Sequence, residues 1–228
     1  MGSCFTSGDF QVSTLAVATI GWILAIASMG GADWRVWYLE EDNAPVISHG
    51  IAWVGFWKVC FYSTVLPSPH ARSDKICHAY NTYDAFIPQD FRAVQNIFLV
   101  ACILGALGKV SIIVALRTFY MGDVHKTTCN PFTLGGFFYT MAGICIIICV
   151  TWNYYAVLRN KSINFPSTFS VPSSPRTQEI GTAVPVAILS AVLLLQAGVL
   201  FLFPKFRVDC QVHPLPLDSG DQLLKYEL

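Results

Sequence analysis

Residues 132–158 read FTLGGFFYTMAGICIIICVTWNYYAVL, and no charged side chain interrupts them. This stretch lies inside a segment of 32 uncharged residues between Lys126 and Arg159. A helix needs roughly 20 apolar residues to cross the hydrocarbon core of a bilayer. The segment is therefore long enough to form a transmembrane helix.

Three further stretches have the same character. Residues 10–32 hold no charge over 23 positions, residues 180–204 hold none over 25, and residues 93–116 hold only Lys109. Four such segments in 228 residues predict four transmembrane helices. Lys109 lies about 12 Å along a helix from Arg117. We therefore expect its amine to reach the membrane interface rather than to form an ion site.

The composition excludes several classes of protein. Charged residues make up 12% of the chain, against about 25% in ordinary globular domains. With 14 basic and 14 acidic side chains the net charge is zero, which argues against a nucleic-acid partner. The five histidines are scattered, and the chain carries no nucleophile elbow, phosphate-binding loop or metalloprotease motif. We expect neither enzymatic activity nor a cofactor or metal.

The predicted fold is that of a mainly α membrane protein: a four-transmembrane-helix bundle with a small extracellular antiparallel β-sheet from loops one and two. An even number of spans places both termini on the same side. The expected segments are an N-terminus at 1–10, a first helix at 11–32, loop one at 33–92, a second helix at 93–116, a connection at 117–131, a third helix at 132–158, loop two at 159–179, a fourth helix at 180–203 and a tail at 204–228.

Loop one is too long to be a structureless connection in a compact protein. It contains three aromatic, β-prone runs: WRVWYL at 34–39, IAWVGFWKVCFY at 51–62 and ICHAYNTYDAF at 76–86. Runs of this composition are typical of strands. We interpret them as strands of a small antiparallel sheet.

Two of the eight cysteines, Cys60 and Cys77, lie in loop one and flank the turn-rich insert LPSPHARSDK. A disulfide closing a loop of about 17 residues would contribute roughly 3 kcal/mol; the alternative is a pair of free thiols. Because a disulfide requires an oxidising compartment, it would place loop one outside the cell and both termini in the cytoplasm. The distribution of basic residues does not settle the orientation.

Two other features are found near the predicted cytoplasmic side. Cys129 and Cys210 lie close to membrane edges, where they are candidates for S-acylation, although cysteines there also serve as small packing residues. The chain ends in Lys-Tyr-Glu-Leu, so Tyr226 and Leu228 fit the loose pattern of a ligand for PDZ scaffold proteins.

The order of residues in loop one resembles the claudin family. Trp34 is followed by Gly55-Phe56-Trp57, then by Cys60 and Cys77; claudins carry a Trp, a Gly-Leu-Trp and two cysteines in that order. The resemblance extends to VTWNYYAVLRN at 150–160 and TQEIG at 177–181. It covers residues 12–204.

The chain departs from the claudin pattern at several points. Phe56 replaces the usual Leu, and the interval of 16 residues between the two cysteines is longer than is typical. Gln95 occupies the place where claudins have an Arg, with Arg92 three residues earlier, and the tail does not end in Tyr-Val. These differences indicate a divergent member.

The resemblance implies a structural protein that self-associates, and associates with other claudins, in the same and in opposing membranes. Such proteins form the barrier or the charge-selective pores of tight junctions at cell–cell contacts of the plasma membrane. An alternative is a protein of the same fold that acts as an auxiliary subunit of a channel, or as a myelin-type membrane protein, without forming strands.

Specific residues follow from this resemblance. Trp34, Gly55, Phe56 and Trp57 are expected to anchor the sheet on the bundle. Trp37 is either an anchor or part of an ordinary aromatic belt at the interface.

Loop two contains Phe165 and Phe169, which either contribute to contacts between cells or pack against loop one. The positions after the two cysteines, Phe61 and His78, carry no formal charge, and no ion selectivity is predicted. Asn160 begins a glycosylation sequon almost at the membrane surface, where we do not expect modification.

Overall fold

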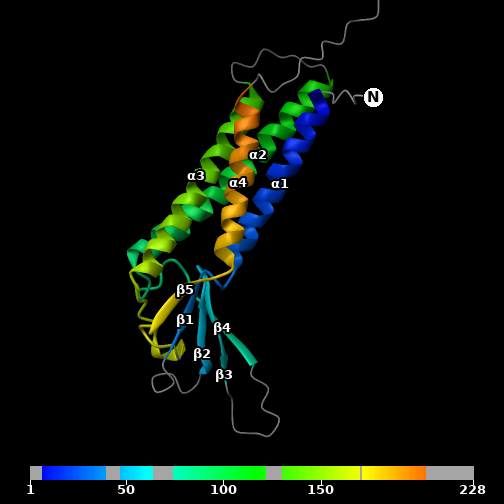
Figure 1. Cartoon of the computed structure of the whole chain (residues 1–228). Coiled ribbons are helices and arrows are strands. Elements are labelled where there is room, and N and C mark those ends of the chain that lie inside the picture. The colour runs from blue at the N-terminus through cyan, green and yellow to red at the C-terminus, as the bar shows by residue number, and fades with distance from the viewer. Residues whose placement is uncertain (1–6, 40–46, 64–73, 122–129, 170, 204–228) are drawn as a thin grey trace, which may run out of the picture.

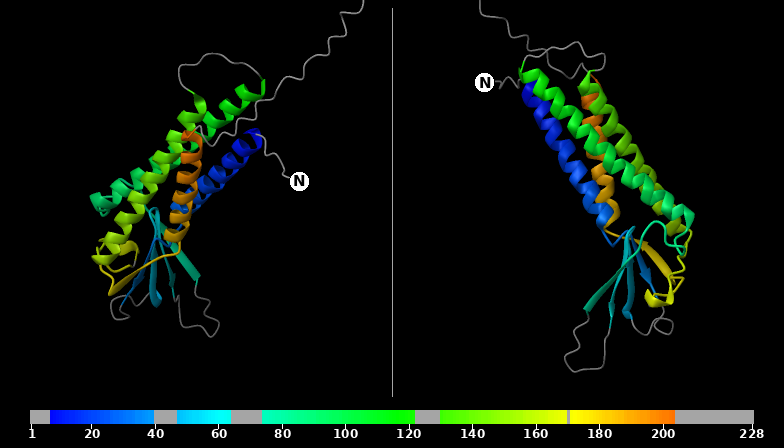
Figure 2. Two further views of the ribbon diagram at one scale, coloured as in Figure 1. Left: turned by 45° about the horizontal axis from the view of Figure 1, so that its top comes forward. Right: turned by 180° about the vertical axis from the view of Figure 1, so that it is seen from behind.

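The computed structural model describes residues 7–39, 47–63, 74–121, 130–169 and 171–203. Within them, four helices run side by side and a sheet lies at one end of the bundle (Figure 1). The start of the first helix and the end of the fourth lie at the opposite end. Two further views show the same separation of bundle and sheet (Figure 2). The predicted architecture is confirmed.

The four helices are each long and apolar enough to cross a membrane. Their bounds are α1 Ser7–Gly30, α2 Gln89–Met121, α3 Pro131–Leu158 and α4 Ala183–Leu202. The start of α3 shows why it begins where it does. Asn130 caps it by accepting a hydrogen bond from the Phe132 N–H at 3.2 Å, and Pro131 occupies the first helical position.

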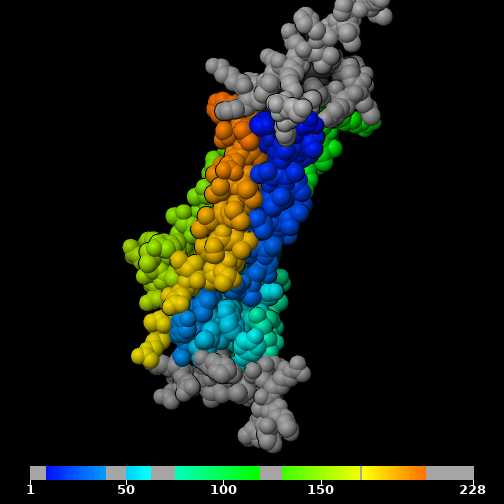
Figure 3. Space-filling view, turned by 45° about the vertical axis from the view of Figure 1, so that its right-hand side comes forward, coloured from blue at the N-terminus to red at the C-terminus, as the bar shows by residue number. Residues whose placement is uncertain are grey.

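The helices form one packed bundle. The α3 helix packs against both α2 and α4, and α1 packs mainly against α4. Figure 3 shows α1 and α4 side by side on one face, above the strands. Their contact is close enough for the Ser190 hydroxyl to donate to the Gly21 carbonyl at 2.8 Å. This bond satisfies a buried hydroxyl between two apolar helices.

The sheet has five antiparallel strands in the order β4-β3-β2-β1-β5. Among the described residues, four strands come from loop one, where three strand runs were predicted, and one comes from loop two; a sheet built from both loops was predicted. They are β1 Arg35–Tyr38, β2 Ile47–Val54, β3 Lys58–Ser63, β4 Asp74–Ala79 and β5 Thr177–Ile180. Residue Ile180, expected at the start of the fourth span, lies in β5.

Two of the expected strand runs differ in the structure. The run at 51–62 is divided by a turn at Gly55–Trp57, so that its halves pair with each other as β2 and β3. The run at 76–86 is strand only as far as Ala79, and the chain then turns toward α2. The first break is a turn within the sheet, and the second leads the chain from the sheet to α2.

Candidate functional site

The candidate site is the junction between the sheet and the helix bundle, together with the aromatic cluster beneath loop two. Trp34 lies at its centre and is 1% exposed. Its indole Nε1 donates to the Ser28 carbonyl of α1 at 2.7 Å. Its ring centroid is 4.1 Å from that of Phe56 and 5.5 Å from that of Phe98 on α2. Trp34 thus connects the first strand to two helices.

The turn between β2 and β3 places Gly55 and Phe56 against the helices. A Cβ atom at Gly55 would lie 2.3 Å from the carbonyl oxygen of Gly31, so only glycine allows the two backbones to approach this closely. Phe56 is fully buried and also contacts Phe91 of α2, with ring centroids 5.6 Å apart. Trp57 is only half-buried, although it packs against the same core.

Gln95 on α2 makes a direct bond to this turn. Its side chain is fully buried, and its amide nitrogen donates to the Phe56 carbonyl. The residue that departs from the family pattern therefore provides a hydrogen-bond donor between bundle and sheet. Tyr80 binds the neighbouring carbonyl of Gly55 through its hydroxyl, and burial raises the pKa of Tyr80.

The disulfide predicted between Cys60 and Cys77 is present. The two residues lie directly opposite each other on β3 and β4. Cys60 is buried and Cys77 is exposed. The bond therefore connects a buried position on β3 to an exposed position on the end strand β4. The insert between them falls largely outside the described residues.

Loop two is attached to loop one by main-chain and side-chain bonds. The β5 strand pairs with β1 over four residues. Gln178 accepts a hydrogen bond from the Trp37 indole at 3.2 Å and donates one to the Lys161 carbonyl at 3.0 Å. The Glu179 carboxylate accepts a hydrogen bond from the Tyr38 hydroxyl at 3.0 Å, which raises the pKa of Tyr38. The two loops form one unit.

The aromatic side chains of loop two pack against loop one. Phe165 is buried, with its ring centroid 5.6 Å from Trp37 and 5.8 Å from Phe86. Phe169, in the 3₁₀ turn Ser167–Phe169, is half-buried and stacks on His78 at 4.8 Å. Phe165 is therefore a core residue of this unit, which is the packing alternative, whereas Phe169 packs on loop one and stays partly accessible.

The structure selects one of the two alternatives for Trp37 and corrects the expectation for Lys109. Trp37 is fully buried between loop two and the sheet, so it is not part of an aromatic belt at the membrane interface. Lys109 does not extend toward the interface. Its amine lies 4.0 Å from the centroid of the Trp22 ring on α1, a cation–π contact between two helices.

The structure also identifies residues that the sequence patterns missed. Asn153 of α3 is buried and bonds to β1 at two points: its Oδ1 accepts from Arg35 Nε at 2.8 Å, and its amide donates to the Trp34 carbonyl at 3.4 Å. The available signal was a polar residue within an apolar span, which is costly unless it has a partner. Cys129, Cys210, Tyr226 and Leu228 lie outside the described residues, so acylation and PDZ binding stay predictions.

Comparison with known proteins identifies the family. A family model described as PMP-22/EMP/MP20/Claudin tight junction matches residues 19–203. Claudin-4 from Bos taurus is 25% identical over 199 residues, covering 86% of this chain and 87% of its own length. Claudin-2 from Mus musculus is 26% identical over 199 residues, covering 84% and 80%. The chain is therefore a divergent member of the PMP-22/EMP/MP20/claudin family of multi-pass membrane proteins.

Proposed function

We propose that this protein is a structural and adhesion component of tight junctions. It would self-associate, and associate with other claudins, within one membrane and between opposing membranes to form a paracellular barrier or pore. The observation that carries the proposal is the rigid attachment of the sheet to the bundle. Trp34 bonds to α1, Phe56 accepts from Gln95 of α2, and Asn153 of α3 binds the first strand.

The outer strands offer surfaces for self-association. Among the residues that the structure describes, β4 and β5 are the end strands of the sheet, and each is paired on one side only. Lys75, Cys77 and Ala79 are exposed along β4, and Thr177 and Glu179 along β5. Unpaired strand edges are natural sites for pairing with another chain. Phe169 at the end of the unit is the half-buried aromatic of loop two that we propose as an adhesion contact.

We infer that the sheet faces the extracellular space. The Cys60–Cys77 disulfide requires an oxidising compartment. The start of α1 and the end of α4 lie at the other end of the bundle, which would place both termini in the cytoplasm. The positions of the disulfide and of the helix ends support the same orientation.

This orientation predicts a labelling result. On intact cells, a membrane-impermeant maleimide should leave Cys60 and Cys77 unmodified. After mild reduction it should modify Cys77, because that residue is exposed on the sheet, whereas Cys60 is buried. The measurement is the mass shift of the purified chain. A double Cys60→Ser, Cys77→Ser variant is the control and should show no reductant-dependent gain. Modification of either cysteine before reduction would contradict the disulfide, whereas no modification of Cys77 after reduction would contradict the orientation.

Adhesion predicts a distribution in cells. Expressed in cells that lack tight junctions, the protein should concentrate at contacts between two expressing cells, because both membranes must supply a partner. Contacts between an expressing and a non-expressing cell are the internal control. Surface expression without enrichment at either kind of contact would refute strand-forming adhesion. Transepithelial resistance with dilution potentials then distinguishes a barrier from a pore.

A second candidate function is that of an auxiliary subunit of a channel or a myelin-type protein with the same fold. The family model that matches the chain also covers PMP-22, EMP and MP20 in its description. Co-purification with one channel, in the absence of homo-oligomers, would favour this function. Homo-oligomers without a channel partner would favour the first proposal.

A further inference from the structure

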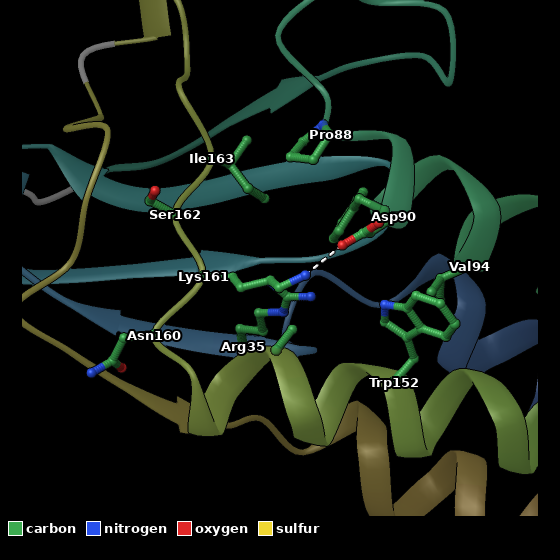
Figure 4. Close-up of a pocket in the computed structure, with 11 residues that line it drawn as sticks. Arg35, Pro88, Asp90, Val94, Trp152, Asn160, Lys161, Ser162 and Ile163 are labelled. Atoms are coloured by element: carbon green, nitrogen blue, oxygen red, sulfur yellow. Dashed lines mark hydrogen bonds and ion pairs between the residues drawn. The ribbon is translucent and has the colours of Figure 1, made fainter.

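A cavity of about 300 Å³ lies where the first strand, the start of α2 and the end of α3 meet (Figure 4). Its lining includes Arg35 from β1, Asp90 from α2, Trp152 from α3 and Lys161 from loop two. These residues come from segments far apart in the sequence. The cavity lies at the end of the bundle that borders the sheet, where the apolar helices give way to polar loops.

Arg35 brings a buried positive charge to this cavity. The residue is 5% exposed, its Nε donates to Asn153 Oδ1 at 2.8 Å, and its guanidinium carbon lies 5.3 Å from the centroid of the Phe91 ring. Among the residues that the structure describes, no carboxylate pairs with it. Desolvation lowers the pKa of Arg35 to about 10, so the group remains charged at neutral pH. A buried charge without a counter-ion is unfavourable unless a ligand supplies one.

The charges around the cavity leave a net positive site. Lys161 forms an ion pair with Asp90, drawn beside Arg35 in Figure 4. These two charges cancel, and the guanidinium contributes one uncompensated positive charge. Arginine presents several N–H donors in a planar fork that matches phosphate and carboxylate oxygens. The site therefore fits a ligand group with one negative charge.

An apolar groove of about 400 Å³ lies on α3 beside the cavity. It is lined by Ile147, Ile148, Thr151, Trp152 and Tyr155, and Trp152 also lines the cavity. This face of α3 is exposed, and the helix is long and apolar enough to cross a membrane. In a membrane, lipid hydrocarbon chains would surround this face. A polar cavity with a positive charge and an adjoining apolar groove match the two halves of an anionic amphiphile.

We propose that Arg35 and Lys161 bind the headgroup of an anionic membrane lipid from the leaflet that borders the sheet. One acyl chain of this lipid lies along the groove between Ile147 and Tyr155. The headgroup supplies the counter-charge that Arg35 lacks within the described residues. Because β1, α2, α3 and loop two all line the cavity, the bound lipid would connect the sheet to the bundle in addition to the contacts of Trp34.

The proposal is tested by lipid retention. The full chain is placed in nanodiscs of phosphatidylcholine with one tenth phosphatidylglycerol of the same chain length. The protein is then released from the nanodiscs, and the lipids that stay bound to it are counted by native mass spectrometry. The wild-type chain should retain one phosphatidylglycerol in preference to phosphatidylcholine. Arg35→Gln should reduce this retention about tenfold, the size expected for one charge-assisted hydrogen-bonded contact. Arg176→Gln removes the same charge at an exposed residue of loop two and should change nothing.

Two more variants keep the test decisive if Arg35→Gln fails to fold. Asp90→Asn removes the carboxylate that holds Lys161, so phosphatidylglycerol retention should rise severalfold; a purely structural Arg35 would not produce this gain. Thr151→Trp fills the apolar groove without touching the cavity and should lower lipid retention. Inorganic phosphate, added as a competitor, should displace the lipid only weakly, because it lacks the acyl chain.

Three outcomes would overturn the proposal. The first is equal retention of the two lipids by the wild-type chain. The second is unchanged retention in both Arg35→Gln and Asp90→Asn. The third is complete displacement by phosphate combined with no effect of Thr151→Trp, which would identify the ligand as a free anion.

Discussion

Trp34→Ala is expected to loosen the sheet from the helix bundle and to lower the free energy of unfolding by about 4 kcal/mol, as for other large-to-small core substitutions. The change removes the ring contacts with Phe56 and Phe98. It also removes the indole donor to the Ser28 carbonyl, which keeps only the bond from the Gly31 N–H at 3.1 Å. We expect the variant to be retained inside the cell, as measured by surface biotinylation. We also expect it to lose its monodisperse peak in mild detergent at a lower temperature than the wild-type chain.

Trp53→Ala is the matched control, because Trp53 lies in the same sheet but is only half-buried, where it contacts Tyr62 and Lys75. Loss of one cross-strand pair of this kind costs about 1 kcal/mol. Trp34→Phe should fall between the two, since it keeps a ring but removes the indole donor. If Trp34→Ala and Trp53→Ala lowered stability and surface delivery equally, Trp34 would not have the anchoring role assigned to it.

The sequence predicted the helices well, because the bilayer imposes a pattern that does not depend on tertiary contacts. A spanning helix must satisfy its backbone internally and exclude charge over its whole length. Stretches such as 132–158 therefore predict their structure from composition alone. The same logic failed for Lys109, because its position on Trp22 depends on how α1 and α2 pack.

The strands were harder to delimit, because their ends are set by contacts with the bundle. The run at 51–62 is rich in strand-forming residues, yet it breaks at Gly55, where the chain must approach the Gly31 carbonyl. Glycine within a strand-like run was the available signal, since it often marks close contact with another backbone.

The candidate site was only partly predictable for a related reason. Trp34 and Phe56 could be assigned from the order of the loop-one motif. Arg35 received no role from the sequence, because its buried position depends on Asn153, which is 118 positions away in the sequence. Phe165 had two interpretations until the pairing of β5 with β1 placed loop two against the sheet. Partners distant in the chain decided each of these cases.

Gly181→Ala is expected to have an effect nearly as large as that of Trp34→Ala, about 3 kcal/mol of stability, although it adds a single methyl group. A Cβ atom at this position would lie 1.8 Å from the Asp33 carbonyl oxygen, and no flexible side chain can move aside. The backbones must separate, which breaks the hydrogen bond from the Gly181 N–H to the Trp34 carbonyl at 3.1 Å and strains the hydrogen bond from the Ala183 N–H to the Asp33 carbonyl at 3.2 Å.

Gly30→Ala is the control, because a Cβ atom there meets nothing within 4 Å. Thermal stability in detergent and surface delivery should fall for Gly181→Ala alone. Equal behaviour of the two variants would show that the junction between β1, β5 and α4 tolerates separation, and that the sheet is not held rigidly at this point.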